Sequence, residues 1–99
     1  MPTPAGQIID KELGAEYTAN YRATGETTLA QVVDVDLIKT LINQEGAKYL
    51  RMYYALKDGK KTLVIVAADA SENDMLDVVV DDTWTCPPHC GAANILNGL

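Results

Sequence analysis

The feature that most constrains this fold is an Asp58-Gly59 pair between two apolar segments. Asp-Gly favours a two-residue type I′ turn, because both central residues of that turn need positive φ. The turn predicts an antiparallel hairpin with arms at residues 47–56 and 61–69, and it fixes the register. The predicted partners are Lys57 with Lys60, Tyr54 with Leu63, Met52 with Ile65, and Leu50 with Ala67. Turn chemistry and apolar pattern agree, so we expect this hairpin to organise the rest of the chain.

The predicted register gives the hairpin two different faces. One face is apolar except for Lys61 at the mouth of the turn. The other face carries aromatic, cationic and β-branched side chains, namely Tyr49, Arg51, Tyr53, Val64 and Val66. Tyrosine and arginine are enriched at protein interfaces, and Arg51 between two tyrosines could also stack on their rings or hold an anionic ligand. This face is the first candidate site, for a homodimer, another protein partner or a small ligand. The structural alternative is that the second helix or the segment around Trp84 covers it, while Arg51 extends to solvent.

Composition excludes several classes of function. Ninety-nine residues, 47% of them hydrophobic, fit one domain with a core of its own. A formal net charge of -6 argues against nucleic acid or an anionic membrane as the partner, since phosphate binding depends on Lys and Arg. No apolar run approaches the roughly 18 residues of a membrane span, and the N-terminus lacks the pattern of a signal peptide. We therefore expect a cytoplasmic protein, in which the two cysteines are favoured as thiols over a structural disulfide.

Two segments have the apolar spacing of a helix. The first begins at an N-cap formed by Asp10 and runs to about Thr24, and the second is capped by Asp34 or Asp36 and runs to about Gln44. Their apolar stripes consist of Leu13, Tyr17 and Tyr21 in the first helix, and Leu37, Ile38, Leu41 and Ile42 in the second. Both stripes predict helices that pack against a sheet.

Two further segments predict strands, and a polar stretch lies between the hairpin and the second of them. Residues 27–33 and 78–80 are rich in β-forming residues, whereas residues 69–77 predict a turn. The turn begins like a calcium loop, with oxygen ligands at its first, third and fifth positions. Asp74 replaces the glycine of such a loop and Val80 replaces its final glutamate, so a solvated turn explains the stretch better.

These elements add up to a single α+β domain over residues 1–99. Two helices are expected to pack on a small antiparallel sheet built around the central hairpin. Residues 1–9 form a loose lead-in, and residues 82–99 form an irregular tail, because Pro87 and Pro88 exclude a helix or a central strand there.

Half of the chain resembles a group of small uncharacterised proteins from Bacteroidetes-type bacteria. The residues that carry the resemblance are Leu50-Arg51-Met52-Tyr53-Tyr54-Ala55, Lys61-Thr62-Leu63-Val64-Ile65-Val66, Asn73-Asp74 and Cys86-Pro87-Pro88-His89-Cys90-Gly91. In the group's pattern a glycine stands in place of Ala55, and an aromatic residue is common in place of His89. The resemblance implies a lineage and no mechanism. It marks these positions as worth testing: Arg51, Tyr53, Asn73, Asp74, Cys86 and Cys90.

The tail holds the second candidate site. Cys86, His89 and Cys90 are three metal-ligand types within five residues, whereas Zn²⁺ usually takes four ligands. Asp81, Asp82 or a partner's residue would have to complete the site. The same cysteines could instead form a disulfide across the Pro-Pro turn, act in redox chemistry, or pack against the sheet as small apolar groups. A Cys-His nucleophile pair is disfavoured, because neighbouring residues tend to point apart.

No set of residues in the sequence predicts a catalytic centre, so we expect a non-enzymatic protein without a cofactor. The favoured function is an interaction or self-association module that uses the Tyr49/Arg51/Tyr53 face. The alternative function is thiol or metal binding, with zinc as the metal, through the two cysteines and the histidine of the tail.

Overall fold

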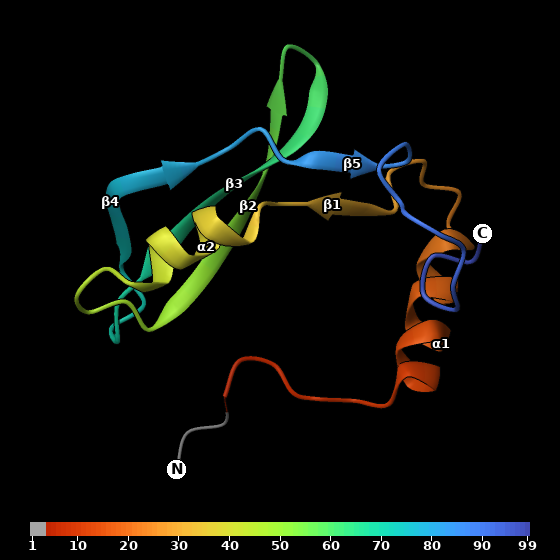
Figure 1. The fold of residues 1–99 in the computed structure, drawn as a ribbon, viewed down its shortest axis with the longest axis horizontal. Helices are drawn as coiled ribbons and strands as arrows, with labels where there is room; N and C mark the ends of the chain where they lie inside the picture. The colour runs from red at the N-terminus through yellow and green to blue at the C-terminus, as the bar shows by residue number, and fades with distance from the viewer. Residues whose placement is uncertain (1–3) are drawn as a thin grey trace.

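The computed structural model describes residues 4–99, and this part of the chain forms two helices and two antiparallel sheets (Figure 1). The elements in chain order are α1 (Lys11–Arg22), β1 (Ala30–Val32), α2 (Val35–Ile42), β2 (Tyr49–Lys57), β3 (Lys60–Ala68), β4 (Asp74–Val80) and β5 (Trp84–Cys86). One sheet has the strand order β2-β3-β4, and the other consists of β1 and β5. The predicted α+β class is therefore confirmed.

The central hairpin forms with the predicted register. Asp58 and Gly59 have φ values of 51° and 77°, which are the positive values that a type I′ turn needs. From Tyr49 opposite Ala68 to Lys57 opposite Lys60, every residue of β2 faces the partner that the turn predicts. The local chemistry of two turn residues thus set the pairing of both strands.

The strand after the hairpin is longer than predicted, because the turn before it is shorter. The carboxylate of Asp69 accepts hydrogen bonds from the backbone N–H groups of Ser71 and Asn73, at 2.9 and 3.0 Å. The backbone N–H of Asp69 also donates to the carbonyl of Asn73 at 2.9 Å, which closes the turn. β4 can therefore begin at Asp74 and pair with β3.

The second helix packs on the hairpin as predicted. The side chain of Asp34 accepts a hydrogen bond from the backbone N–H of Asp36 at 3.0 Å, so Asp34 is the N-cap. Leu41 of α2 is fully buried together with Ile65 and Ala67 of β3. This cluster on the apolar face of the hairpin is the core of the molecule.

The second sheet was not predicted, because its strands lie more than fifty residues apart in the sequence. β1 pairs with β5, in the segment expected to be irregular. A buried threonine pair joins this sheet to the hairpin. The hydroxyl of Thr83 accepts a hydrogen bond from the backbone N–H of Leu63 at 2.9 Å and donates one to the side-chain oxygen of Gln31 at 2.8 Å. The backbone N–H of Thr83 donates a hydrogen bond to the hydroxyl of Thr62 at 3.1 Å.

The first helix does not lie on the hairpin sheet, so the expectation that both helices pack there is wrong for α1. None of its residues is fully buried, and Figure 1 shows it standing apart from the hairpin. It contacts the C-terminal tail instead. Arg22 donates to the carbonyl of Leu96 at 2.8 Å, and the Leu96 side chain lies beside Gly14. The physical reason is that the 23–29 connection leads α1 to the far end of the β1–β5 sheet.

The molecule is consequently open. Its radius of gyration is 15.2 Å, whereas a compact chain of this length has about 13 Å. Its accessible surface is 7592 Å², compared with about 5,500 Å² for a compact monomer of its mass. The excess is about 2,000 Å². The fold therefore leaves exposed much of the surface that a compact chain of this size would bury.

Candidate functional site

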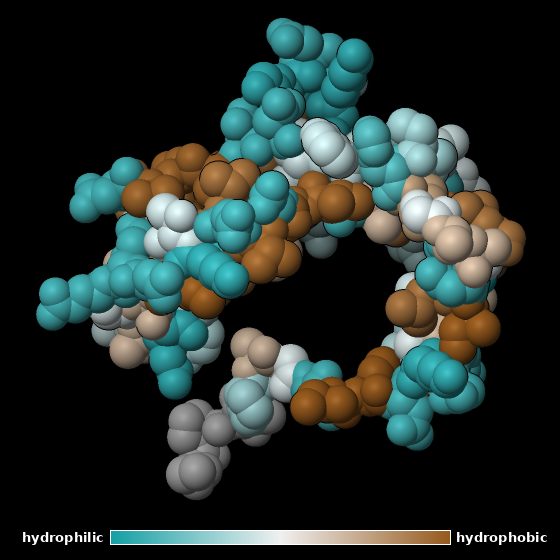
Figure 2. All heavy atoms as spheres, viewed as in Figure 1, coloured by the Kyte–Doolittle hydropathy of each residue, from teal (hydrophilic) through white to brown (hydrophobic). Residues whose placement is uncertain are grey.

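A cleft of about 930 Å³ lies between α1, the start of β1 and the outer half of the hairpin. Figure 2 shows that the side of the molecule that carries α1 is separated from the hairpin by a wide gap, with hydrophobic atoms along much of its rim. Its apolar lining is contributed by three separate parts of the chain: Tyr17 and Tyr21 on α1, Tyr54 and Leu56 on β2, Leu63 on β3, and Leu96 in the tail. This cleft is mostly apolar and is open enough to receive another molecule.

The cleft exists because α2 is too short to cover the hairpin. Eight helical residues span about 12 Å, whereas the nine residues of β2 span about 30 Å. The helix therefore covers only the base of the apolar face. Toward the turn, Tyr54 is 95% exposed and Leu56 is 73% exposed. Apolar side chains at such exposure, grouped on one face, are typical of a binding surface.

The sequence analysis did not single out Tyr54 and Leu56 as site residues, because both lie on the hairpin face on which the two helices were expected to pack. The signal that could have found them was the difference in length between the predicted second helix and the hairpin arms. A helix ending near residue 44 could not have reached the Asp58-Gly59 turn.

The opposite face of the hairpin carries the residues first predicted as an interface, and the structure joins two of them to a third. Asp74, at the start of β4, accepts hydrogen bonds from both Arg51 and the hydroxyl of Tyr53. Arg51 also donates to the backbone carbonyl of Glu72 at 3.0 Å. The cover over this part of the face thus comes from the β3–β4 turn, and neither α2 nor the Trp84 segment supplies these contacts.

The charges of this network stabilise one another. The hydrogen bond from Tyr53, followed by the hydrogen bond and charge of Arg51, lowers the pKa of Asp74 below its ordinary value. The bond to Asp74 raises the pKa of Arg51 and also that of Tyr53. Asp74 is therefore held as a carboxylate, and the Arg51 guanidinium is already paired within the chain.

The remaining predicted residues of this face differ in accessibility. Val66 is only 2% exposed, so it cannot contact a partner. Tyr49 is exposed and Val64 is half-buried. On this face the charge of Arg51 is neutralised and Val66 is covered, whereas Tyr49 stays accessible.

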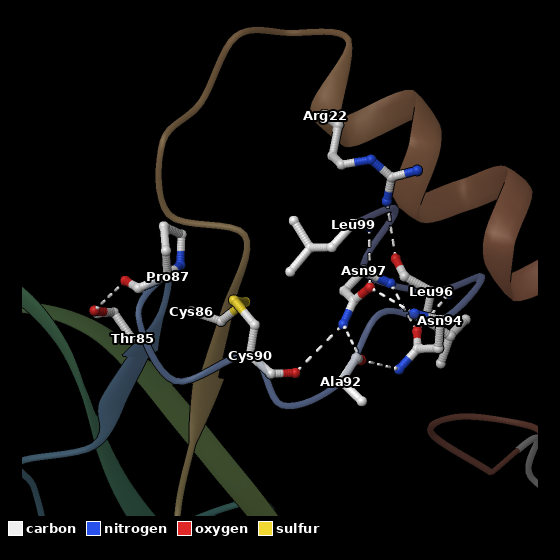
Figure 3. The surroundings of a disulfide bond; sticks show 10 residues. All are labelled: Arg22, Thr85, Cys86, Pro87, Cys90, Ala92, Asn94, Leu96, Asn97 and Leu99. Carbon is white, nitrogen blue, oxygen red and sulfur yellow. Dashed lines mark hydrogen bonds between the residues drawn. A yellow bond between two sulfur atoms is a disulfide. The ribbon is translucent and has the colours of Figure 1, made fainter.

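In the structure the tail cysteines are joined in a disulfide, which is one of the alternatives that the sequence left open (Figure 3). The Cα atoms of Cys86 and Cys90 are 4.7 Å apart, and Cys86 is buried in β5. His89 stacks on Trp84 with ring centroids 4.6 Å apart. As a disulfide, neither sulfur is available as a thiolate ligand, and among residues 4–99 no three His, Cys, Asp or Glu side chains are grouped to hold a metal ion.

The disulfide loop anchors the end of the chain. Asn97 donates from its side-chain amide to the carbonyls of Cys90 and Ala92, at 3.3 and 3.0 Å (Figure 3). Asn94 and Asn97 also accept from nearby backbone N–H groups, which folds residues 92–99 into a compact turn. This turn presents the Leu96 carbonyl to Arg22 of α1. The tail therefore connects the disulfide to the helix that forms one wall of the cleft.

Comparisons with protein family models, with curated proteins and with solved structures find no match to this chain. Within the described part of the chain, no helix is long and apolar enough to cross a membrane. The function must therefore be argued from the geometry of the molecule itself.

Proposed function

We propose that this protein is a non-enzymatic self-association module, and that a second copy of the chain packs against the outer hairpin, beside the cleft. The observation that carries the proposal is the exposure of Tyr54 and Leu56 beside a second exposed apolar stripe, Tyr17 and Tyr21 of α1. Exposed apolar groups gathered on facing walls favour burial by association.

The exposed area supports a second copy as the occupant. The excess over a compact monomer is about 2,000 Å² per chain. Obligate homodimers bury about 2,000 to 5,000 Å² in total, which is about 1,000 to 2,500 Å² per chain. The excess is of the same order as the surface that one stable homodimer covers, and the extended, exposed residues 4–10 account for part of it.

The charges around the cleft favour an apolar occupant over an ionic ligand. Its three charged lining residues are already engaged within the chain. Lys61 pairs with Glu26 at 3.3 Å, and Arg22 donates to the tail carbonyl of Leu96. A second copy presents the same apolar surface to the first, with its Lys61 and Glu26 already paired.

The test is the oligomeric state of two matched variants, measured by sedimentation velocity. Leu56→Lys places a charge on the proposed interface, whereas Leu76→Lys makes the same change at a comparably exposed position on β4, 70% exposed and outside the cleft. Burying one leucine stabilises by about 1.5–3 kcal/mol, and a symmetric dimer buries it twice, so Leu56→Lys should weaken the dimer by about a hundredfold or more.

The expected result is a dimer for the native protein and for Leu76→Lys, and a monomer for Leu56→Lys. Circular dichroism checks that both variants keep the native fold. A native protein that sediments as a monomer would overturn the proposal, and so would equal association of the two variants.

A further inference from the structure

We propose that the two copies associate by antiparallel pairing of their β2 strands about a two-fold axis at Tyr53, which joins two three-stranded sheets into one of six strands. This inference rests on the proposed self-association and specifies its geometry. The starting observation is that β2 is an edge strand, since the order of its sheet is β2-β3-β4. None of its nine residues is buried.

The two edges of this sheet differ in how they are protected. β4 is interrupted by a bulge in its pairing with β3 and carries the exposed acid Asp77 at its centre. Bulges and charges of this kind prevent edge strands from pairing with other chains. β2 pairs with β3 without a bulge, contains no proline or acid, and is apolar or aromatic except at Arg51 and Lys57. The β2 edge therefore lacks the features that keep the β4 edge unpaired.

The hairpin turn determines which backbone groups face the free edge. A two-residue turn makes Lys57 and Lys60 a hydrogen-bonded pair, and such pairs alternate along an antiparallel ladder. Odd-numbered residues of β2 therefore bond to β3. The even-numbered residues point their N–H and C=O groups outward: Leu50, Met52, Tyr54 and Leu56. The residues with unpaired backbone groups are thus the same residues whose side chains form the apolar face.

The register follows from strand length and charge. A two-fold axis at Tyr53 pairs all nine residues, with Met52 opposite the partner's Tyr54 and Leu50 opposite the partner's Leu56. If the two-fold axis is moved one residue toward the turn, Arg51 lies opposite the partner's Lys57. This register is unfavourable because like charges then face each other. If the axis is moved one residue away from the turn, Lys57 lies beyond the end of the partner strand. Only the central register pairs the full strand without repulsion.

Pairing in this register also extends the apolar face of the sheet across the axis. The Tyr54 side chains of the two copies lie near the axis on that face, next to the partner's Met52. Cross-strand pairs that include an aromatic residue are among the more stabilising in antiparallel sheets. The proposed pairing thus gives a cross-strand neighbour to Tyr54, the most exposed large hydrophobic side chain of the hairpin.

The test is disulfide cross-linking at the axis. In the central register Tyr53→Cys faces its own symmetry mate as a non-hydrogen-bonded pair, with Cα atoms about 4.5 Å apart, which a disulfide can bridge. Ala55→Cys is the matched control, because it lies on the same side of the strand but opposite the partner's Arg51. The native cysteines are joined to each other and serve as the background.

We expect mild oxidation to convert Tyr53→Cys to a covalent dimer on a non-reducing gel and to leave Ala55→Cys monomeric there. If both variants sediment as dimers but neither cross-links, or both do so equally, β2 pairing is overturned while self-association stands. If all forms sediment as monomers, both proposals fail.

A measurement on the native protein covers the case in which Tyr53→Cys does not fold. Amide exchange should be slow for Met52, Tyr54 and Leu56 in the dimer, and this protection should be lost on dilution to the monomer. Fast exchange of these three amides in the dimer would contradict the pairing.

Discussion

Asp74 shows how much one side chain can decide in a small protein. It lies on the third strand of the hairpin sheet but receives its two hydrogen bonds from the first strand, across β3. It thereby neutralises Arg51, whose partner across the hairpin is the buried Val66. From the sequence, Tyr49, Arg51 and Tyr53 were expected to form an accessible surface. In the structure Arg51 and Tyr53 are joined to Asp74 by hydrogen bonds.

We predict that Asp74→Asn lowers the free energy of unfolding at neutral pH, because the amide carries no charge for Arg51. The folded-state pKa of Asp74 is lowered from the ordinary 3.8. Its contribution is therefore complete above pH 3.8, declines as the pH falls below that value, and is lost once the pH passes the lowered pKa. Urea unfolding across this range should show the native protein and the variant converging at acid pH.

Asp77→Asn is the control for this prediction, since it removes the same charge from an exposed position on the same strand. A stability difference between native protein and Asp74→Asn that stays constant from neutral to acid pH would contradict the assigned role of Asp74.

At the scale of elements, the two sheets depend on a small polar junction. Thr62 and Thr83 are buried, and their hydroxyls satisfy backbone groups at the point where the chain leaves the hairpin sheet for the β1–β5 sheet. Apolar contact between the two sheets is limited, because the buried core cluster lies on β3, β4 and α2 and includes no residue of β1 or β5. The hydrogen bonds of Thr83 therefore position the second sheet.

We predict that Thr83→Val destabilises the protein by about 1–3 kcal/mol, because valine keeps the shape but leaves the N–H of Leu63 and the oxygen of Gln31 without their partner. Thr40→Val is a suitable control. Its hydroxyl donates to the Asp36 carbonyl on the exposed face of α2, so its loss should change stability by less than about 0.5 kcal/mol. If the two substitutions lowered the free energy of unfolding in urea equally, the hydrogen bonds of Thr83 would contribute no more to stability than the exposed hydroxyl of Thr40.

At the scale of the whole molecule, the first helix and the tail form a unit that is separate from the core. A helix of twelve residues is marginal by itself in water. Arg22 at the end of this helix is hydrogen-bonded to the tail turn, and Asn97 hydrogen-bonds that turn to Cys90 of the disulfide loop. The open shape is therefore maintained by a few polar contacts at one end, and the apolar surface between the two units is available for association.

We predict that the stability of the native protein rises with its concentration. If a second copy binds only the folded state, mass action shifts the unfolding equilibrium toward the folded dimer. The Tm from calorimetry should therefore rise as the concentration of the native protein rises. For the monomeric Leu56→Lys variant the Tm should not depend on concentration. A Tm independent of concentration for both proteins would show that folding and association are not linked.

Several features of this protein could be predicted from the sequence because they depend on neighbours in the chain. The hairpin register follows from the φ requirements of Asp58 and Gly59, and the start of α2 follows from the side chain of Asp34. The stripe on α1 was also identified, although its partner was not. Local hydrogen bonds and turn geometry cost little chain entropy to form, so a short sequence specifies them.

The tertiary structure decided everything that joins distant segments. The pairing of β1 with β5, the bond of Thr83 to Gln31, and the position of α1 against the tail each connect residues far apart in sequence. The disulfide also depended on a turn that brings the Cα atoms of Cys86 and Cys90 within 4.7 Å. The sequence by itself determined which surfaces are apolar, but which of them stay exposed depended on the lengths and directions of whole elements. The cleft was decided at that level, because α2 ends before it reaches the outer hairpin and α1 is directed away from it.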